Sequence, residues 1–173
     1  AWVWDIHPDG NAKTIDWKTF QEPVALKNRI PFGDEALKRF FRWRCWYDYG
    51  TGLSGDLLSH DYDTINQIMN IGIPKYASST GGIYYYKDGR DVPDVWNATF
   101  EFPEKDLTVL YSATLSSNNP RGNRIMGHDA TMMMGGQSGG GNIHGFIVTP
   151  DEASTQYRDR IQNGIINTRY PMY

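Results

Sequence analysis

The sequence predicts an α+β fold in which a mostly antiparallel, open-faced β-sheet has helices packed on one face. Helical patterns come first, near residues 34–43 and 55–69, and period-two patterns dominate from about residue 75 onward. Consecutive strand patterns with no helices between them are typical of a meandering antiparallel sheet. The chain has 173 residues, of which 39% are hydrophobic, so we expect residues 1–173 to form a single α+β domain with a real core.

Helix signals mark the first half of the chain. In DEALKRFFRW (34–43), Asp34 is a candidate N-cap for a helix with an apolar face. The segment from about Gly55 to Met69 has Ser54 as its candidate N-cap and Asp56 in the first turn, where a carboxylate suits the helix dipole. Of the shorter segments, TIDWKTF is expected to form a turn or strand, and Trp2–Trp4 reads as the end of a strand.

Strand signals fill most of the second half, and residues 101–111 (EFPEKDLTVLY) are the clearest hairpin. The predicted strands are KYASST, IYYYKD, VWNATFEF, LTVLYSATL, NRIMGHD, ATMMMGG and HGFIVTP. We expect a flexible loop at GGQSGGGN (135–142) and a short helix at 151–164. One sheet face is expected to pack on the helix 55–69. The other face, rich in Tyr, Trp and Met, is expected to be an interface, because monomers rarely expose large apolar patches.

Charge and hydropathy argue against several classes of partner. The 17 basic and 20 acidic residues are well mixed and give a net charge of −3, so we expect no nucleic-acid partner despite the basic aromatic run LKRFFRWR. No stretch approaches the ~18 consecutive apolar residues of a membrane helix. Cys45 is the single cysteine, which excludes a disulfide framework within the chain. It is either a nucleophile or, more commonly, a small buried apolar residue.

The pattern Asp56, His60 and Asp63 is the first candidate functional site. Residues at i, i+4 and i+7 lie on one helix face, and a carboxylate beside an imidazole can produce a general acid or base. The Gly50–Gly52 turn that precedes this helix allows a backbone to approach a ligand. The alternative is an ordinary polar helix face.

The aromatic and basic run FFRWRCWYDYG (40–50) is the second candidate. Arginine beside aromatic rings is common in sugar and anion binding, and here the residues concerned are Trp43, Arg44 and Tyr47. A core segment whose arginines extend to solvent explains the same pattern equally well.

A metal site is the weaker alternative. His60 with Asp56 or Asp63, plus His128 or His144, could bind zinc or iron, but no H-E-x-x-H, H-x-H or cysteine pair is present. We therefore expect no metal.

Several segments, taken together and in order, resemble the C-terminal domain of the glucose-fructose oxidoreductase / inositol dehydrogenase / MocA family. They are IDWKTF, the long run from FFRWRCWYDYGTG through SGDLLSHDYD to DGRDVPDVWNATFEFP, and RIMGHDATMMM. In that family a Gly-rich turn leads into a helix bearing Asp-x-x-x-His, often with a further Asp three residues on. The resemblance covers most of residues 15–135.

This resemblance implies the substrate half of an NAD- or NADP-dependent sugar or polyol dehydrogenase. His60 would be the acid/base that takes the substrate hydroxyl proton, and Asp56 would orient His60 and touch the sugar. The remaining pocket residues would be Arg44, Trp43, Tyr47 and Asp63. The exposed sheet face would be a homo-oligomer interface. Apart from the resemblance, we expect the cytoplasm as the compartment, with the periplasm as the alternative.

The chain departs from the family pattern in what it lacks. The Rossmann domain and its Lys in an E-K-P-like motif are not in this sequence, so no residue here is expected to bind the cofactor. The usual Gly between the Asp and the His is replaced by Leu or Ser. We therefore expect a fragment or a cleaved chain, inactive alone, with removal of a signal peptide before Ala1 as the alternative. A non-catalytic binding or oligomerisation module of the same fold, and a metal-dependent lyase or hydrolase, are the other readings.

Overall fold

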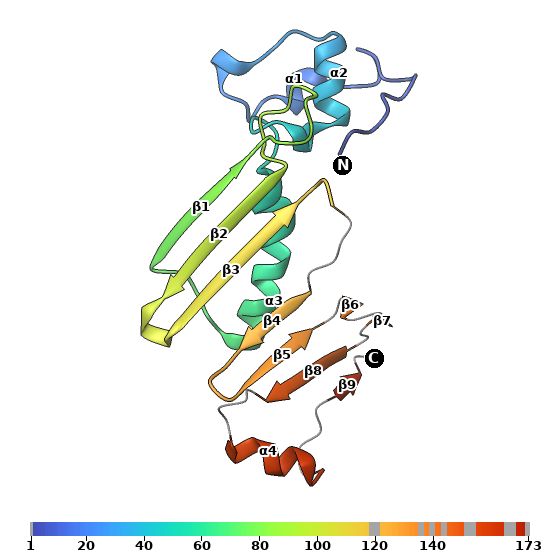
Figure 1. Ribbon diagram of the computed structural model, residues 1–173. Coiled ribbons are helices and arrows are strands. Elements are labelled where there is room, and N and C mark those ends of the chain that lie inside the picture. The colour runs from blue at the N-terminus through green and yellow to red at the C-terminus, as the bar shows by residue number, and fades with distance from the viewer. Residues whose placement is uncertain are drawn as a thin grey trace. The chain divides into compact units, whose positions relative to one another are not determined.

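The protein has an α+β fold in which the first helices precede antiparallel sheets of three, four and two strands in the part of the chain that the structure describes (Figure 1). The computed structural model describes residues 2–117, 122–134, 137–138, 141–142, 145–150, 155–164 and 169–171. The chain divides into two compact units, Ala1–Ser117 and Asn118–Tyr173. The fold class predicted from the sequence is confirmed. The single domain over residues 1–173 stays a prediction, because each unit is described by itself.

An aromatic cluster forms the core of the helical part of the first unit. Its helices are α1 (Trp17–Phe20), α2 (Asp34–Phe41) and the 3₁₀ helices Leu26–Asn28 and Trp43–Cys45. Trp17 is buried and stacks on Phe20, which in turn stacks on Tyr49 with ring centroids 5.3 Å apart. Within the described residues no helix is long and apolar enough to cross a membrane.

Three local expectations for this region are wrong. TIDWKTF contains a helix and not a strand, because the Asp16 side chain caps α1 by accepting from the Thr19 backbone N–H at 3.1 Å. Trp2–Trp4 has no strand partner among the described residues. Asp34 is the first helical residue of α2, and Gly33 occupies the N-cap.

The helix that carries the candidate site begins with a wide turn. Residues Ser54–Leu58 are π-helical and continue directly into α3 (Ser59–Met69). Ser54 is therefore not the N-cap, and its hydroxyl donates to the Thr51 carbonyl at 2.7 Å. A Cβ at Gly55 would lie 1.6 Å from the Thr51 hydroxyl oxygen, so this path of the backbone requires glycine. π-Helical turns inside α-helices are frequent at functional sites.

Helix α3 covers one face of the first sheet, as predicted (Figure 1). The sheet has the order β1-β2-β3, with β1 at Tyr76–Gly82, β2 at Val95–Phe102 and β3 at Leu107–Thr114. The Tyr62 ring of α3 meets the Phe100 ring of β2 edge to face, with centroids 5.8 Å apart. The β2–β3 hairpin is confirmed, and its loop contains the 3₁₀ helix Pro103–Lys105.

The expectation of an aromatic open face is wrong for this sheet. The register pairs Trp96 with Ala113 and Ala98 with Tyr111, which places both aromatic rings on the same face as Phe100, toward α3. The opposite face is mostly polar. Its residues are Tyr76, Ser78, Thr80, Val95, Asn97, Thr99, Glu101, Thr108, Leu110, Ser112 and Thr114. Whether this face joins copies of the chain stays a prediction.

The segment IYYYKD (83–88) is not a strand, although its residues favour one. The fully buried Asp94 carboxylate accepts the backbone N–H groups of Tyr84, Tyr85 and Tyr86 at 2.9, 2.8 and 2.7 Å. Those donors are therefore used in a turn and are not available for a sheet.

The second unit contains the sheet β4-β5-β8-β9, in which every strand pairs antiparallel. Its strands are β4 (Asn123–Met126), β5 (Ala130–Met134), β8 (Gly145–Pro150) and β9 (Arg169–Pro171). The expected helix is confirmed as α4 (Thr155–Gln162). The expected loop 135–142 is instead interrupted by two short paired strands, β6 (Gln137–Ser138) and β7 (Gly141–Asn142).

Candidate functional site

Arg44 and Asp56 form an ion pair at the start of the π-helical turn. The Arg44 Nε lies 3.3 Å from Asp56 Oδ1. The Arg44 guanidinium also lies over the Trp43 ring, 4.2 Å from its centroid. A Cβ at Gly50 would lie 3.3 Å from the same ring, so Trp43 packs closely on the Gly-rich turn. Trp43 therefore fixes the plane of the guanidinium that faces Asp56.

The second oxygen of Asp56 is the unusual atom of the site. The Asp56 side chain is only 19% exposed, and its Oδ2 is buried with no hydrogen-bond partner in the part of the chain that the structure describes. A buried acceptor left without a donor costs about 1–3 kcal/mol. Because this oxygen is closed off from solvent, a ligand hydroxyl can donate to it and recover that cost only after a side-chain movement that opens the site.

His60 lies one helical turn after Asp56, with an exposed side chain. Among the described residues the imidazole makes no hydrogen bond to Asp56 or Asp63, and the His60 carbonyl accepts from the Thr64 hydroxyl. The expected orientation of His60 by Asp56 therefore stays a prediction.

Asp63 and Tyr47 lie outside the Arg44–Asp56 contact. Asp63 accepts from the Gln67 side chain at 2.7 Å and lines a groove of about 410 Å³. The other lining residues are Ser54, Leu58, Ser59, Tyr62, Asn66, Gly72, Ile73, Pro74 and Phe100. Tyr47 is 56% exposed, and burial, with a smaller effect of Asp91, raises the pKa of its phenol. Of the six site residues predicted from the sequence, the structure thus brings three into contact: Trp43, Arg44 and Asp56.

No group of three or more metal-ligating side chains occurs among the described residues. His144, one of the remote histidines considered for a metal, lies outside them. The strands that the structure describes pair only antiparallel, so they provide no strand–loop–helix unit for a dinucleotide phosphate.

A segment that no sequence prediction connected with the site contacts the backbone next to Arg44. We call Asp88–Asp94 the strap. The Cys45 carbonyl accepts the backbone N–H groups of Asp91 at 3.2 Å and Val92 at 3.4 Å, and Asp91 Oδ1 accepts the Tyr47 N–H at 2.8 Å. Cys45 is itself buried, and burial raises the pKa of its thiol, in agreement with its reading as a small apolar residue.

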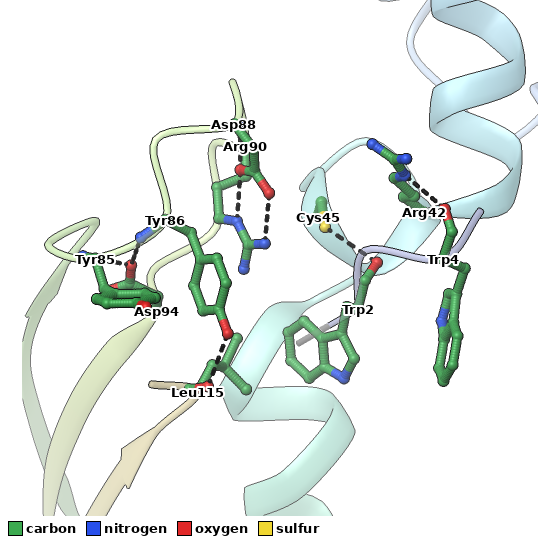
Figure 2. A network of polar contacts seen from close by, with 10 residues as sticks. All are labelled: Trp2, Trp4, Arg42, Cys45, Tyr85, Tyr86, Asp88, Arg90, Asp94 and Leu115. Carbon is green, nitrogen blue, oxygen red and sulfur yellow. Dashed lines mark hydrogen bonds and ion pairs between the residues drawn. The ribbon is translucent and has the colours of Figure 1, made fainter. Parts of the chain in front are cut away.

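Figure 2 shows the N-terminal segment on the other side of Cys45, where Trp2 accepts from the thiol and Trp4 accepts from Arg42 at 2.8 Å. The segment that carries Trp43 and Arg44 is therefore held from two sides. Turn residues and acidic side chains in DGRDVPD were the available signal for the strap. Nothing in the sequence indicated which segment it would contact.

Among solved structures, the chain is similar to the "putative oxidoreductase yvaA" from Bacillus subtilis. The identity is 20% and the TM-score is 0.42, over 71% of this chain and 29% of that one. The chain thus spans under a third of the length of that protein. No protein-family model and no curated protein matches the chain.

Proposed function

We propose that this chain is the substrate-binding half of a nicotinamide-dependent oxidoreductase that acts on a sugar or polyol. The observation that carries the proposal is Asp56 Oδ2, a buried carboxylate oxygen without a partner among the described residues, next to the Arg44 guanidinium. Polyhydroxylated ligands are recognised by a few well-placed polar groups, and each hydroxyl can donate to a carboxylate and accept from a guanidinium. The Arg44–Asp56 pair offers both at one place.

Each residue then has a distinct role in the proposal. Asp56 accepts a substrate hydroxyl, Arg44 donates to a neighbouring one, and Trp43 fixes Arg44. His60 removes the proton of the reacting hydroxyl, while a hydride leaves its carbon for NAD or NADP. The nicotinamide would be bound by a Rossmann domain that is not in this sequence. Tyr47 and Asp63 are proposed as outer residues of the pocket.

Two further parts of the proposal concern the setting of the chain. We propose that it forms a homo-oligomer through the open face of the β1-β2-β3 sheet, where Leu110 and Tyr76 are 72% and 56% exposed. We propose the cytoplasm as the compartment, with the periplasm as the alternative. Light scattering that shows a monomer for the intact gene product would contradict the first of these.

A second candidate function is a non-catalytic sugar-binding or assembly module of the same fold. The observation that favours it is the exposed His60 imidazole, which has no hydrogen-bond partner in the described part of the chain. A general base is normally oriented by a neighbouring group. This candidate keeps the Arg44–Asp56 site and omits the proton transfer.

Ligand binding by the chain itself tests the part that both candidates have in common. We expect a panel of sugars and polyols, titrated into the ¹⁵N-labelled chain, to shift the Arg44 and Trp43 side-chain signals for at least one member. Asp56→Ala should weaken that binding by roughly tenfold or more, the effect of losing a hydrogen bond to a charged group. Asp106→Asn is the matched control, because Asp106 lies in the β2–β3 loop. Binding that is equal in wild type and Asp56→Ala contradicts the proposed site.

A further inference from the structure

We propose that the strap, through Asp91, is the element that positions Arg44 against Asp56, which makes Asp91 a positioning residue of the site. Its effect on ligand binding rests on the proposed function. Its effect on the Arg44–Asp56 geometry does not.

The strap contacts the segment that carries Arg44. Cys45, the next residue, is 1% exposed, and its carbonyl accepts both the Asp91 and the Val92 backbone N–H groups. Two residues further on, the Tyr47 N–H donates to Asp91 Oδ1 at 2.8 Å. A bond from a backbone N–H to a carboxylate is stronger than a neutral one. Asp91 therefore contributes both its backbone and its side chain to holding the Arg44 segment.

The strap also contacts the turn that leads to Asp56. Gly52 has φ +60, and a Cβ added there would lie 3.2 Å from Val92 Cβ. Val92 is fully buried, and the neighbouring Leu53 is only 2% exposed. The turn therefore packs closely on the strap at Gly52, four residues before Asp56. One short segment thus fixes both sequence neighbourhoods that supply the ion pair.

The strap is itself rigidly held, as a positioning element must be. Arg90 has a fully buried side chain, pairs with Asp88 at 2.7 Å and lies 4.3 Å from the centre of the Tyr86 ring. At its other end Asp94 accepts three backbone N–H groups (Figure 2 shows part of this network). The strap thus has few alternative conformations available when the Arg44 segment contacts it.

Rigid support matters here because Arg44 and Asp56 come from segments 12 positions apart. An arginine side chain has several rotatable bonds, and a small backbone displacement at Cys45 moves the guanidinium away from Asp56 Oδ1. Binding sites lose affinity when such supporting contacts are loosened.

The experiment compares Asp91→Ala with Asp91→Asn and with the control Asp16→Ala. Asp16 also accepts a backbone N–H with its carboxylate, from Thr19, but it does so at α1. The first readout is the ¹⁵N signal of the Arg44 Nε–H, assigned by its loss in Arg44→Lys. The second is the affinity for the tightest-binding sugar or polyol of the panel.

We expect Asp91→Ala to shift the Arg44 Nε–H signal and to weaken binding by about tenfold, the effect of losing the charge-assisted hydrogen bond that a displaced Arg44 no longer donates to the ligand. Asp91→Asn should keep an Arg44 signal and a ligand affinity close to those of wild type, because its amide oxygen can still accept from the Tyr47 N–H. Asp16→Ala should change neither. If Asp91→Ala does not fold, Asp91→Glu replaces it, since the extra methylene displaces the carboxylate from the Tyr47 N–H.

An unmoved Arg44 Nε–H signal in the folded Asp91 variant overturns the proposal, and so does an equal shift in Asp16→Ala. The two proposals fail separately. If wild type binds no member of the panel while the Arg44 signal still responds to Asp91→Ala, the proposed function is wrong and the positioning role stands.

Discussion

Arg44 Nε and Asp56 Oδ1 lie 3.3 Å apart, and this pair joins the segment after α2 to the π-helical start of α3. Arg44→Leu would leave a mostly buried carboxylate without its cation. We expect the free energy of unfolding to fall by about 1–2 kcal/mol, a value reduced because Arg44 is 37% exposed. Urea denaturation measures it, with the exposed Arg124→Leu as control.

Arg44→Lys sharpens this prediction. Lysine keeps the charge but loses the planar group that lies over Trp43, so its stability should fall between wild type and Arg44→Leu. A Leu variant as stable as wild type would show that the pair contributes nothing to the fold.

Asp94 is the second target, because one side chain organises the whole 84–86 turn. Asp94→Ala leaves three backbone N–H groups without their acceptor inside the protein, and we expect a loss of about 3 kcal/mol or more. Asp94→Asn should lose less, since its amide oxygen still accepts. Thermal unfolding that is unchanged in the Ala variant would contradict this role.

The same residue makes stability depend on pH in a defined direction. Burial alone would raise the pKa of the Asp94 carboxyl, but the N–H groups of Tyr84, Tyr86 and Tyr85 and the nearby Arg90 together lower it below its ordinary value of 3.8. The folded state therefore favours the carboxylate. Its contribution is complete above pH values near 3.8 and is lost as the pH falls through the lower folded pKa.

We therefore expect Asp94→Asn to reduce the fall in stability that acid causes in wild type. Urea midpoints at pH 7 and below pH 4 measure this, with Asp106→Asn as control. Equal acid sensitivity of Asp94→Asn and wild type would refute the linkage.

Tyr111 provides an independent check on the packing of α3 against the sheet. Burial, and to a lesser extent Asp61, raises the pKa of the Tyr111 phenol to about 12. We expect one tyrosine signal, absent in Tyr111→Phe, to titrate near pH 12 in ¹³C-labelled protein, and Asp61→Asn to lower its pKa. A Tyr111 signal that titrates near pH 10 would mean that α3 does not cover it.

Gly52 tests the contact between the Gly-rich turn and Val92. Gly52→Ala introduces a Cβ at φ +60 and 3.2 Å from Val92, so we expect it to destabilise by about 1–3 kcal/mol. Gly89→Ala is matched, because Gly89 has φ +90 and no atom within 4 Å of the added Cβ. A larger loss at Gly89 would remove the special role of the Val92 contact.

The sequence predicted the elements whose signals are local. The β2–β3 hairpin and the α2 and α3 helices follow from hydrophobic periodicity and turn residues. IYYYKD failed because its β-propensity was overridden by Asp94, eight to ten positions away, which takes the backbone donors. Tertiary contacts of this kind leave no periodic pattern in the sequence.

The candidate site was only partly predictable for a related reason. Helical spacing placed Asp56 and His60 on neighbouring turns, and the aromatic run indicated Trp43 and Arg44. Spacing does not show that Arg44 pairs with Asp56, since that contact depends on how the Gly50–Gly52 turn folds back. The role of the strap is less visible still, because backbone atoms make most of its contacts.

Hydride transfer by the intact gene product tests the central claim most directly. We expect NAD or NADP to be reduced in the presence of at least one sugar or polyol that binds this chain, and His60→Ala to lower turnover by ~10²–10⁴ while the fold and ligand affinity are kept. Turnover that is unchanged in a folded His60→Ala variant would contradict the account.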